Sequence, residues 1–403
     1  MTIPIRRSRT GAGAVAALLL TAATLTGTAH AAQDTPAAGA SGASTSDAAP
    51  GHQATLNALQ AAVQAGVPGA VAEIRDGNGT WRAAVGVGNR QTGQSRNLND
   101  RFRIGGLTNT FVATVLLQME AEGRLSLDDT VQHHLPGVVT GNGNDGSKIT
   151  VRQLLNHTTG LYDYLADPTY YETYTLGDGF LRHRYDTLTP QQRLRVAFAH
   201  PPSFPAGSRH SFSHTNDLLA ALVVEAVGST YEEEVRRRVI APLGLTATSH
   251  PGTGTALPKP SSRHYSKLFY GTQPDRIDDV TALNGSQNWG DGDMISSAAD
   301  LNRFYGALMG GKLLPARQLA ELKAAVVNPD FPSSSYGLGV ERLTMSCGTD
   351  VWYHDGGVVG SLTVSAFTED GRRALTFNYN GDWEFSQLLA TMSAEFCPAS
   401  TTH

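Results

Sequence analysis

The sequence predicts an α/β fold: an antiparallel sheet flanked by helices, plus an inserted, mostly helical domain. Strand-like segments lie near both ends of the 403-residue chain, and helix-like segments fill its middle. A Gly- and Asn-containing turn between two strand-like segments near the start is a hairpin signal, which indicates that the sheet begins antiparallel. Because strands come from both ends, we expect the sheet to be closed by the two termini of its own domain.

The first 31 residues have the pattern of a secretory signal peptide. A basic segment precedes an apolar stretch, and a small-residue Ala-His-Ala sequence ends at Ala31. Residues 32–52 are rich in Ala, Gly, Ser and Thr without apolar periodicity, which predicts a flexible tether. We therefore expect a secreted, extracellular protein whose folded domain spans 53–397 and ends in a tail at 398–403.

The folded part opens with a predicted hairpin and a long helix. The hairpin pairs residues 71–74 with 81–87 around a turn at 76–79, and the helix runs from Thr108 to Glu122 before Gly123. Further helices are predicted at 151–156, 191–199, 216–227, 298–309 and 386–396, and further strands at 336–340, 351–354, 362–367 and 374–379. These elements predict a sheet subdomain at about 53–105 and 335–397, with a helical subdomain at about 106–334.

Composition excludes several classes of protein. Charged residues make up 17% of the chain and the net charge is -5, so no basic surface is expected for nucleic acid. No apolar run beyond the N-terminus is long enough for a transmembrane helix. Two cysteines, Cys347 and Cys397, are too few for a disulfide-rich scaffold. In an exported protein we expect them to pair; the alternative is two buried free thiols.

Several blocks, in the same order along the chain, resemble the serine β-lactamase and penicillin-binding-protein family. The similarity extends over about 53–397 and is greatest to secreted actinomycete D-alanyl-D-alanine carboxypeptidases and class C-type β-lactamases. The blocks that carry the resemblance are Phe102–Gly105, Thr110–Thr114, Gly123–Asp129, Ile149–Leu161 and Ser297–Leu301. The resemblance implies an active-site groove lined by three motifs.

The first motif of this family is Ser-x-x-Lys at the start of the long helix. The lysine lies one helical turn from the serine, where its amine can take the hydroxyl proton. Here the corresponding tetrad is Gly106-Leu107-Thr108-Asn109. Glycine has no hydroxyl and the neutral amide of Asn109 cannot accept a proton, so both nucleophile and base are absent from these positions.

The second motif is changed as well, whereas the third keeps its outline. The family's Tyr-x-Asn corresponds to Phe212 and His214, which lose the phenol and the amide. The family's Lys/His-Thr-Gly corresponds to His354, Asp355 and Gly356, followed by Gly357. The resemblance also implies an oxyanion hole built from two backbone N–H groups, those of Gly106 and Gly357, which side-chain replacement does not remove.

Four changed motif positions within an intact scaffold predict a pseudoenzyme that acts by binding. We expect a monomeric protein whose former active-site groove takes a peptidoglycan-like peptide, another small acyl ligand or a protein partner. The alternative is an enzyme: a carboxypeptidase- or β-lactamase-type hydrolase with a displaced nucleophile at Thr108, Thr110 or Ser213, or a pocket that catalyses a non-covalent reaction.

No cofactor or metal ion is expected. His210, His214 and His354 could in principle surround a zinc ion, but solvated or structural histidines are the preferred interpretation. Asp291 and Asp293 lie in a Gly-Asp repeat that favours a surface turn beside the groove.

Overall fold

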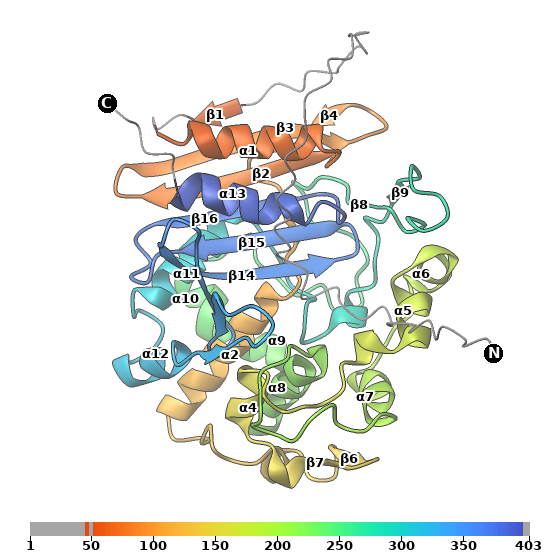
Figure 1. The fold of residues 1–403 in the computed structure, drawn as a ribbon, viewed down its shortest axis with the longest axis vertical. Coiled ribbons are helices and arrows are strands. Elements are labelled where there is room, and N and C mark those ends of the chain that lie inside the picture. Colours follow the sequence, from red (N-terminus) through yellow and green to blue (C-terminus); the bar gives the residue numbers. More distant parts are fainter. Residues whose placement is uncertain (1–44, 48–50, 398–403) are drawn as a thin grey trace, which may run out of the picture.

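The computed structural model describes residues 45–47 and 51–397, and its centre is a ten-stranded antiparallel sheet (Figure 1). The predicted signal peptide, the tail at 398–403 and most of the predicted tether lie outside the described residues. The strand order is β1-β3-β2-β16-β15-β14-β13-β12-β11, with β4 beside β3. The strands are β1 (Thr45–Asp47), β2 (Gly69–Asp76), β3 (Gly79–Asn89), β4 (Gln94–Ser95), β11 (Val326–Val327), β12 (Ser334–Tyr336), β13 (Glu341–Thr344), β14 (Asp350–Val358), β15 (Ser361–Phe367) and β16 (Ala374–Tyr379).

The sheet is closed by strands from the two ends of the chain, as the sequence predicts. Strand β2 pairs with β3 through a turn between Asp76 and Gly79, and on its other side with β16, where Arg75 faces Ala374. Within the predicted tether, β1 pairs antiparallel with β3 and His52 is buried. Ordered structure therefore begins before α1.

Helices cover both faces of the sheet. In Figure 1, α1 and α13 lie side by side across one face, and their apolar side chains share a core with the strands. Helices α2 and α11 pack on the other face, and α4, α7 and α8 gather below the sheet. The helices are α1 (Gln53–Gln64), α2 (Leu107–Ala121), α3 (Val131–His134), α4 (Val151–Leu155), α5 (Pro168–Tyr174), α6 (Gly177–His183), α7 (Pro190–Phe198), α8 (His214–Val227), α9 (Tyr231–Val235), α10 (Ala241–Leu243), α11 (Ala298–Met309), α12 (Ala316–Leu322) and α13 (Ser386–Phe396).

Three two-stranded sheets lie outside the main sheet in the described ranges. They are β5 (Phe102–Arg103) with β10 (Ile295–Ser296), β6 (Thr140–Gly141) with β7 (Asn144–Asp145), and β8 (Tyr265–Ser266) with β9 (Asp278–Asp279). The pair β5–β10 matters most for the site, because β5 delivers the chain to the first turn of α2. None of the helices among the described residues is both long and apolar enough to cross a bilayer.

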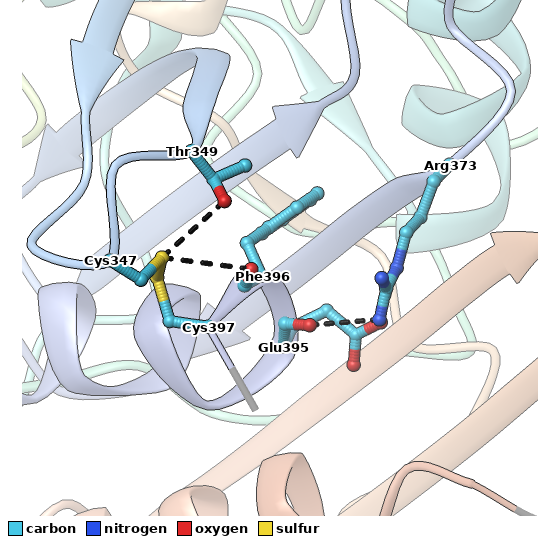
Figure 2. Close-up of a disulfide and its surroundings, with 6 residues drawn as sticks. All are labelled: Cys347, Thr349, Arg373, Glu395, Phe396 and Cys397. Carbon is cyan, nitrogen blue, oxygen red and sulfur yellow. Dashed lines mark hydrogen bonds and ion pairs between the residues drawn. A yellow bond between two sulfur atoms is a disulfide. The ribbon is translucent and has the colours of Figure 1, made fainter. Parts of the chain in front are cut away.

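A disulfide and an ion pair fasten the C-terminal helix (Figure 2). Cys347 and Cys397 are bonded, which confirms the predicted pairing and joins the β13–β14 turn to the end of α13. Glu395 on the same helix accepts hydrogen bonds from Arg373 at 2.6 Å and from Thr55 of α1 at 2.7 Å. Its side chain also lies 3.1 Å from Nδ1 of His52. The start and the end of the domain are thereby held together.

One predicted strand is displaced. The sequence predicts a strand over 336–340, whereas β12 ends at Tyr336 and the chain turns, with the Gly337 N–H donating to the carbonyl of Val340 at 2.7 Å. Gly339 has φ +76, and a β-carbon there would stand 2.8 Å from that of Ala113 in α2. The backbone turns because it must pass closely over this helix.

Candidate functional site

Helix α2 begins at the centre of the molecule with a glycine. Gly106 is its N-cap residue, with helical φ and ψ of -57 and -14 and no side chain to cap the first turn. The chain reaches it through Gly105, whose φ is +56 and whose backbone passes so close to β14 that a β-carbon there would stand 2.8 Å from the Gly357 nitrogen. Gly105 therefore allows the helix start to lie directly against the end of β14.

Three motif positions meet around Gly106. A β-carbon on Gly106 would stand 3.0 Å from the carbonyl oxygen of Asp355, 3.3 Å from Cε1 of His354 and 3.7 Å from Nδ2 of Asn109. Gly356 is equally close, since a β-carbon there would stand 2.6 Å from the Gly106 nitrogen. The structure thus brings the first and third sequence motifs into contact at the helix start.

Asn109 is buried without hydrogen-bond partners. Its side chain is in the first turn of α2 and the residue is 3% exposed, yet neither its amide oxygen nor its amide nitrogen finds a partner among the described residues. The hydroxyl of Thr108 likewise has no hydrogen-bond partner among these residues. A buried polar group left unpaired costs about 1–3 kcal/mol. The first turn of α2 therefore carries polar groups that receive no hydrogen bond from residues 51–397.

His354 is a neutral, doubly hydrogen-bonded imidazole. Its Nδ1 lies 2.6 Å from the carbonyl oxygen of Asp355 and therefore donates, which leaves Nε2 to accept from the Tyr336 hydroxyl at 2.9 Å. Burial lowers the pKa of His354 to about 4. The ring is fixed in orientation and uncharged at neutral pH.

Asp355 and Gly357 form the outer part of the third motif. Burial raises the pKa of the Asp355 carboxyl to about 6, and the negative charge of this group contributes to raising the pKa of Glu341 on β13. Gly357 is exposed, so its backbone remains accessible beside the start of α2.

Phe212 belongs to a group of packed rings. Its ring centroid lies 4.3 Å from that of His157 and 5.0 Å from that of His214. Tyr336 packs against the same group, 4.9 Å from His157. Phe212 therefore supplies packing where a tyrosine would supply a hydroxyl.

His214 forms an ion pair that the sequence did not reveal. It opens α8, and its Nδ1 lies 3.0 Å from Oδ2 of Asp163. Burial acts to lower the pKa of His214, but the charge and hydrogen bond of Asp163 outweigh it and raise the pKa to about 9. The ring is an imidazolium at neutral pH, and its Nε2–H has no protein partner among the residues described.

A buried acid, Asp217, lies one turn further along α8. Oδ1 of Asp217 is 3.6 Å from Nε2 of His157, whereas its Oδ2 has no partner in the described part of the chain. Burial raises the pKa of Asp217 and lowers that of His157, so both tend to be neutral. Nδ1 of His157 accepts the backbone N–H of Ser213 at 3.3 Å.

The alternative nucleophiles lack a base. Thr110 donates to the carbonyl of Gly339 at 2.7 Å, so its hydroxyl is committed to the backbone. The hydroxyls of Thr108 and Ser213 have no partner among the residues that the structure describes, and both residues are buried. A nucleophilic hydroxyl requires a base within hydrogen-bond reach, and this geometry provides none for these groups.

The three histidines considered for zinc do not form a ligand set. His210 directs Nδ1 to the carbonyl of Asn156 at 2.9 Å, and both nitrogens of His354 are occupied as described. Within 51–397, the one group of His, Cys, Asp and Glu side chains close enough to hold an ion lies elsewhere, at Asp129, His133 and His134.

The prediction that Asp291 and Asp293 lie in a surface turn is wrong. Asp291 is 3% exposed and lies 3.1 Å from the guanidinium of Arg193, which is itself fully buried. Asp293 is 2% exposed and accepts a hydrogen bond from Tyr231. Both carboxylates can be buried because each has a partner from the helical region, the guanidinium of Arg193 for Asp291 and the hydroxyl of Tyr231 for Asp293. These contacts hold in place the loop that carries the two acids.

A match to a protein-family model shows which family the chain belongs to. The family model described as "Beta-lactamase" matches residues 51–388. The chain belongs to the beta-lactamase family. This membership confirms the fold that the sequence motifs predicted.

Known members of the beta-lactamase family show how the chain relates to individual proteins. A crystal structure of a D-stereospecific amidohydrolase from Streptomyces sp. is 48% identical, with a TM-score of 0.81, covering 87% of this chain and 100% of that one. The putative penicillin-binding protein PbpX of Bacillus subtilis is 25% identical over 68% of this chain, and esterase EstB of Burkholderia gladioli is 33% identical over 44%. The chain spans 62% and 45% of the length of these two relatives.

Proposed function

We propose that this protein is a secreted beta-lactamase-family pseudoenzyme that binds a small acyl ligand without forming an acyl-enzyme. The proposal rests on the start of α2, where the sequence resemblance assigns Gly106 and Asn109 to the positions of the family's nucleophile and base. Without a hydroxyl at 106 no ester to the ligand can form there, and without an amine at 109 no proton can be taken up.

The groups around Gly106 suit an oxygen-bearing ligand. The Asn109 amide offers both a donor and an acceptor. We assign the Nε2–H of the His214 imidazolium to the same ligand as a further donor, because the resemblance places His214 in a motif of the same groove. We place the backbone N–H groups of Gly106 and Gly357 beside them as an oxyanion hole, on the strength of the close approach of these two segments. Donors therefore outnumber acceptors, which favours a carbonyl or carboxylate over a cationic ligand.

The ligand class is inferred from relatives. The 48% identical structure is that of a D-stereospecific amidohydrolase, and other relatives include a penicillin-binding protein and a putative D-alanyl-D-alanine carboxypeptidase. We therefore propose a D-configured aminoacyl or peptidyl ligand, such as the D-Ala end of a peptidoglycan stem peptide.

The second candidate function is hydrolysis by a displaced nucleophile or by non-covalent catalysis. The high identity to an amidohydrolase favours it. So do the hydroxyls of Thr108 and Ser213 next to the motif positions, which have no partner within the described ranges. Against it stands the absence of a base for either hydroxyl in the described residues.

One pair of measurements separates the two candidates. The chain is incubated with benzylpenicillin or a fluorophosphonate for intact-mass analysis, and its thermal unfolding is followed with D- and with L-phenylalanine amide. Binding without chemistry predicts an unmodified mass, an intact amide and a higher Tm with the D-enantiomer, because a ligand of the folded state stabilises it by RT ln(1 + [L]/Kd).

A stoichiometric adduct, or release of ammonia, would overturn the pseudoenzyme proposal and direct peptide mapping to Thr108 and Ser213. No stabilisation by either enantiomer or by a D-Ala-D-Ala peptide would contradict the ligand class.

A further inference from the structure

Three metal-ligating side chains meet at the surface, none of them from the family motifs. Asp129 ends the turn after α2, and His133 and His134 end the single turn of α3. Each offers a ligand atom, and these atoms lie within 4.8 Å of one another. We propose that Asp129, His133 and His134 bind one divalent transition-metal ion.

The spacing of two of the ligands already fits a metal. Nε2 of His134 lies 3.1 Å from Oδ2 of Asp129. Zinc binds histidine nitrogen at about 2.0–2.1 Å and carboxylate oxygen at about 2.0–2.2 Å, so two such ligands stand roughly 3.0–3.4 Å apart at octahedral or tetrahedral angles. An ion can therefore replace the proton shared by Asp129 and His134, and the side chain of His133 has only to rotate towards it.

Asp129 is held in place and ionised before any ion arrives. Its Oδ2 accepts the backbone N–H of Ser126 at 2.8 Å, and its own carbonyl accepts the N–H of Val151 at 3.0 Å. The Ser126 hydrogen bond is the main reason that the pKa of Asp129 lies below its ordinary value. A carboxylate supported in this way loses little freedom when it coordinates an ion.

The two histidines are also suitably placed. The Thr130 side chain accepts the His133 N–H at 3.2 Å and so fixes the backbone of α3. The rings of His133 and His134 lie edge to face with centroids 4.8 Å apart. His133 is exposed and the Asp129 side chain is 32% exposed, so an ion can enter from solvent. Two imidazoles and one carboxylate suit Zn²⁺, Ni²⁺ or Cu²⁺, with water in the remaining positions.

The test is a calorimetric titration of the full chain, prepared without a polyhistidine tag and freed of metal with EDTA. With ZnCl₂ or NiCl₂ at pH 7.5 we expect one ion per chain. His133→Ala and Asp129→Asn should each weaken binding at least about tenfold, since even the loss of a supporting hydrogen bond costs about 10–100-fold.

His200→Ala is the matched control. Nε2 of His200 lies 3.1 Å from Oδ2 of Asp167, the same spacing as in the proposed site, but no second histidine joins that pair among the described residues. The control should bind the ion as tightly as the parent. Unchanged affinity in His133→Ala, or an equal loss in His200→Ala, would overturn the proposal.

A spectroscopic readout keeps the test valid if Asp129→Asn folds poorly. His133 is exposed, so His133→Ala should keep the metal-free Tm of the parent. Co²⁺ bound to the parent should give visible absorption bands that this variant lacks. Identical Co²⁺ spectra for the two proteins would show that the ion binds elsewhere and would refute the site.

Discussion

The imidazole of His354 closes over Gly106: a β-carbon on the glycine would stand only 3.3 Å from Cε1 of the ring. The Asp355 carbonyl is closer still, at 3.0 Å. A side chain at position 106 would therefore require both groups on β14 to move by a few tenths of an ångström. The start of α2 and the end of β14 are fitted to each other around a residue without a side chain.

Restoring the family motifs should restore acylation. We expect the fourfold variant Gly106→Ser, Asn109→Lys, Phe212→Tyr and His214→Asn to form a penicillin adduct in intact-mass spectra, because it regains hydroxyl, base, phenol and amide. The threefold variant that keeps Gly106 is the control and should stay unmodified. A fourfold variant that folds but remains inert would mean that the groove has changed shape beyond the four positions.

Replacing Asn109 should separate stability from binding. The Asn109 amide is buried and has no hydrogen-bond partner in the described part of the chain. Asn109→Ala therefore removes two unsatisfied groups and should raise the free energy of unfolding by about 1 kcal/mol. The same change should abolish the rise in Tm caused by D-phenylalanine amide. Both effects are measured by denaturant and thermal unfolding.

Thr114→Ala serves as the control for Asn109→Ala, because it lies in the same helix. The Thr114 hydroxyl is buried and donates to the Thr110 carbonyl at 2.7 Å, so its loss should destabilise the protein by about 1 kcal/mol. Ligand stabilisation should persist in this variant. An Asn109→Ala variant as destabilised as Thr114→Ala would show that the Asn109 amide makes hydrogen bonds in the folded protein.

The His214–Asp163 pair should make stability depend on pH. The folded pKa of His214, about 9, lies above the ordinary value of 6.5, so the folded state binds the proton more tightly. Its contribution is therefore complete below about pH 6.5 and is lost as the pH rises through about 9. Asp163→Asn should lower the free energy of unfolding by on the order of 1–2 kcal/mol at pH 7 and flatten this dependence.

Chemical denaturation at pH 6, 7.5 and 9 measures this effect. Asp186→Asn is the comparison, since Asp186 pairs with His183 at 2.7 Å but both side chains are well exposed, and solvent screens exposed pairs. An Asp163→Asn variant whose loss of stability is the same at pH 6 and pH 9 would show that His214 is not charged in the folded protein.

Removing the disulfide should destabilise the domain strongly. Cys347 and Cys397 are separated by 50 positions, and a loop of that length corresponds to about 4 kcal/mol in the chain-entropy model. The double variant Cys347→Ser, Cys397→Ser should lose that amount in denaturant unfolding, and the parent treated with a reductant should behave alike. Equal midpoints for oxidised and reduced protein would contradict this expectation.

Local patterns predicted much of the fold. The helices at 298–309 and 386–396 were predicted with the bounds that α11 and α13 have, because their apolar periodicity is strong and clear breaks flank them. The strand predicted at 336–340 failed because its geometry is set by α2, which packs against Gly339. Local propensity carries no information about such a contact.

For the candidate site, the sequence predicts motif positions but not the residues that contact them in the structure. Gly106, Asn109, Phe212, His214 and His354 could be found by resemblance, since each stands in a recognisable block. Asp163 could not, because its ion pair with His214 joins segments 51 positions apart. Arg193 could not be found either, because it lies 98 positions from its partner Asp291. Its ion pair allows the loop of Asp291, which the sequence predicts to be a surface turn, to be buried. The sequence signal that was available for Asp163 is its place directly after the Ile149–Leu161 block.

The pairing of β2 with β16 sets an order of events during folding. This pairing places Arg75 opposite Ala374, about 300 residues further along the chain. The free edge of the β2–β3 hairpin, formed by β2, is therefore covered only when the last strand, β16, adds to it. That edge is built largely from small and branched apolar residues and can pair with other chains while it is open. We expect refolding to be slow and yield to fall as protein concentration rises, so that dilution or a chaperone improves recovery.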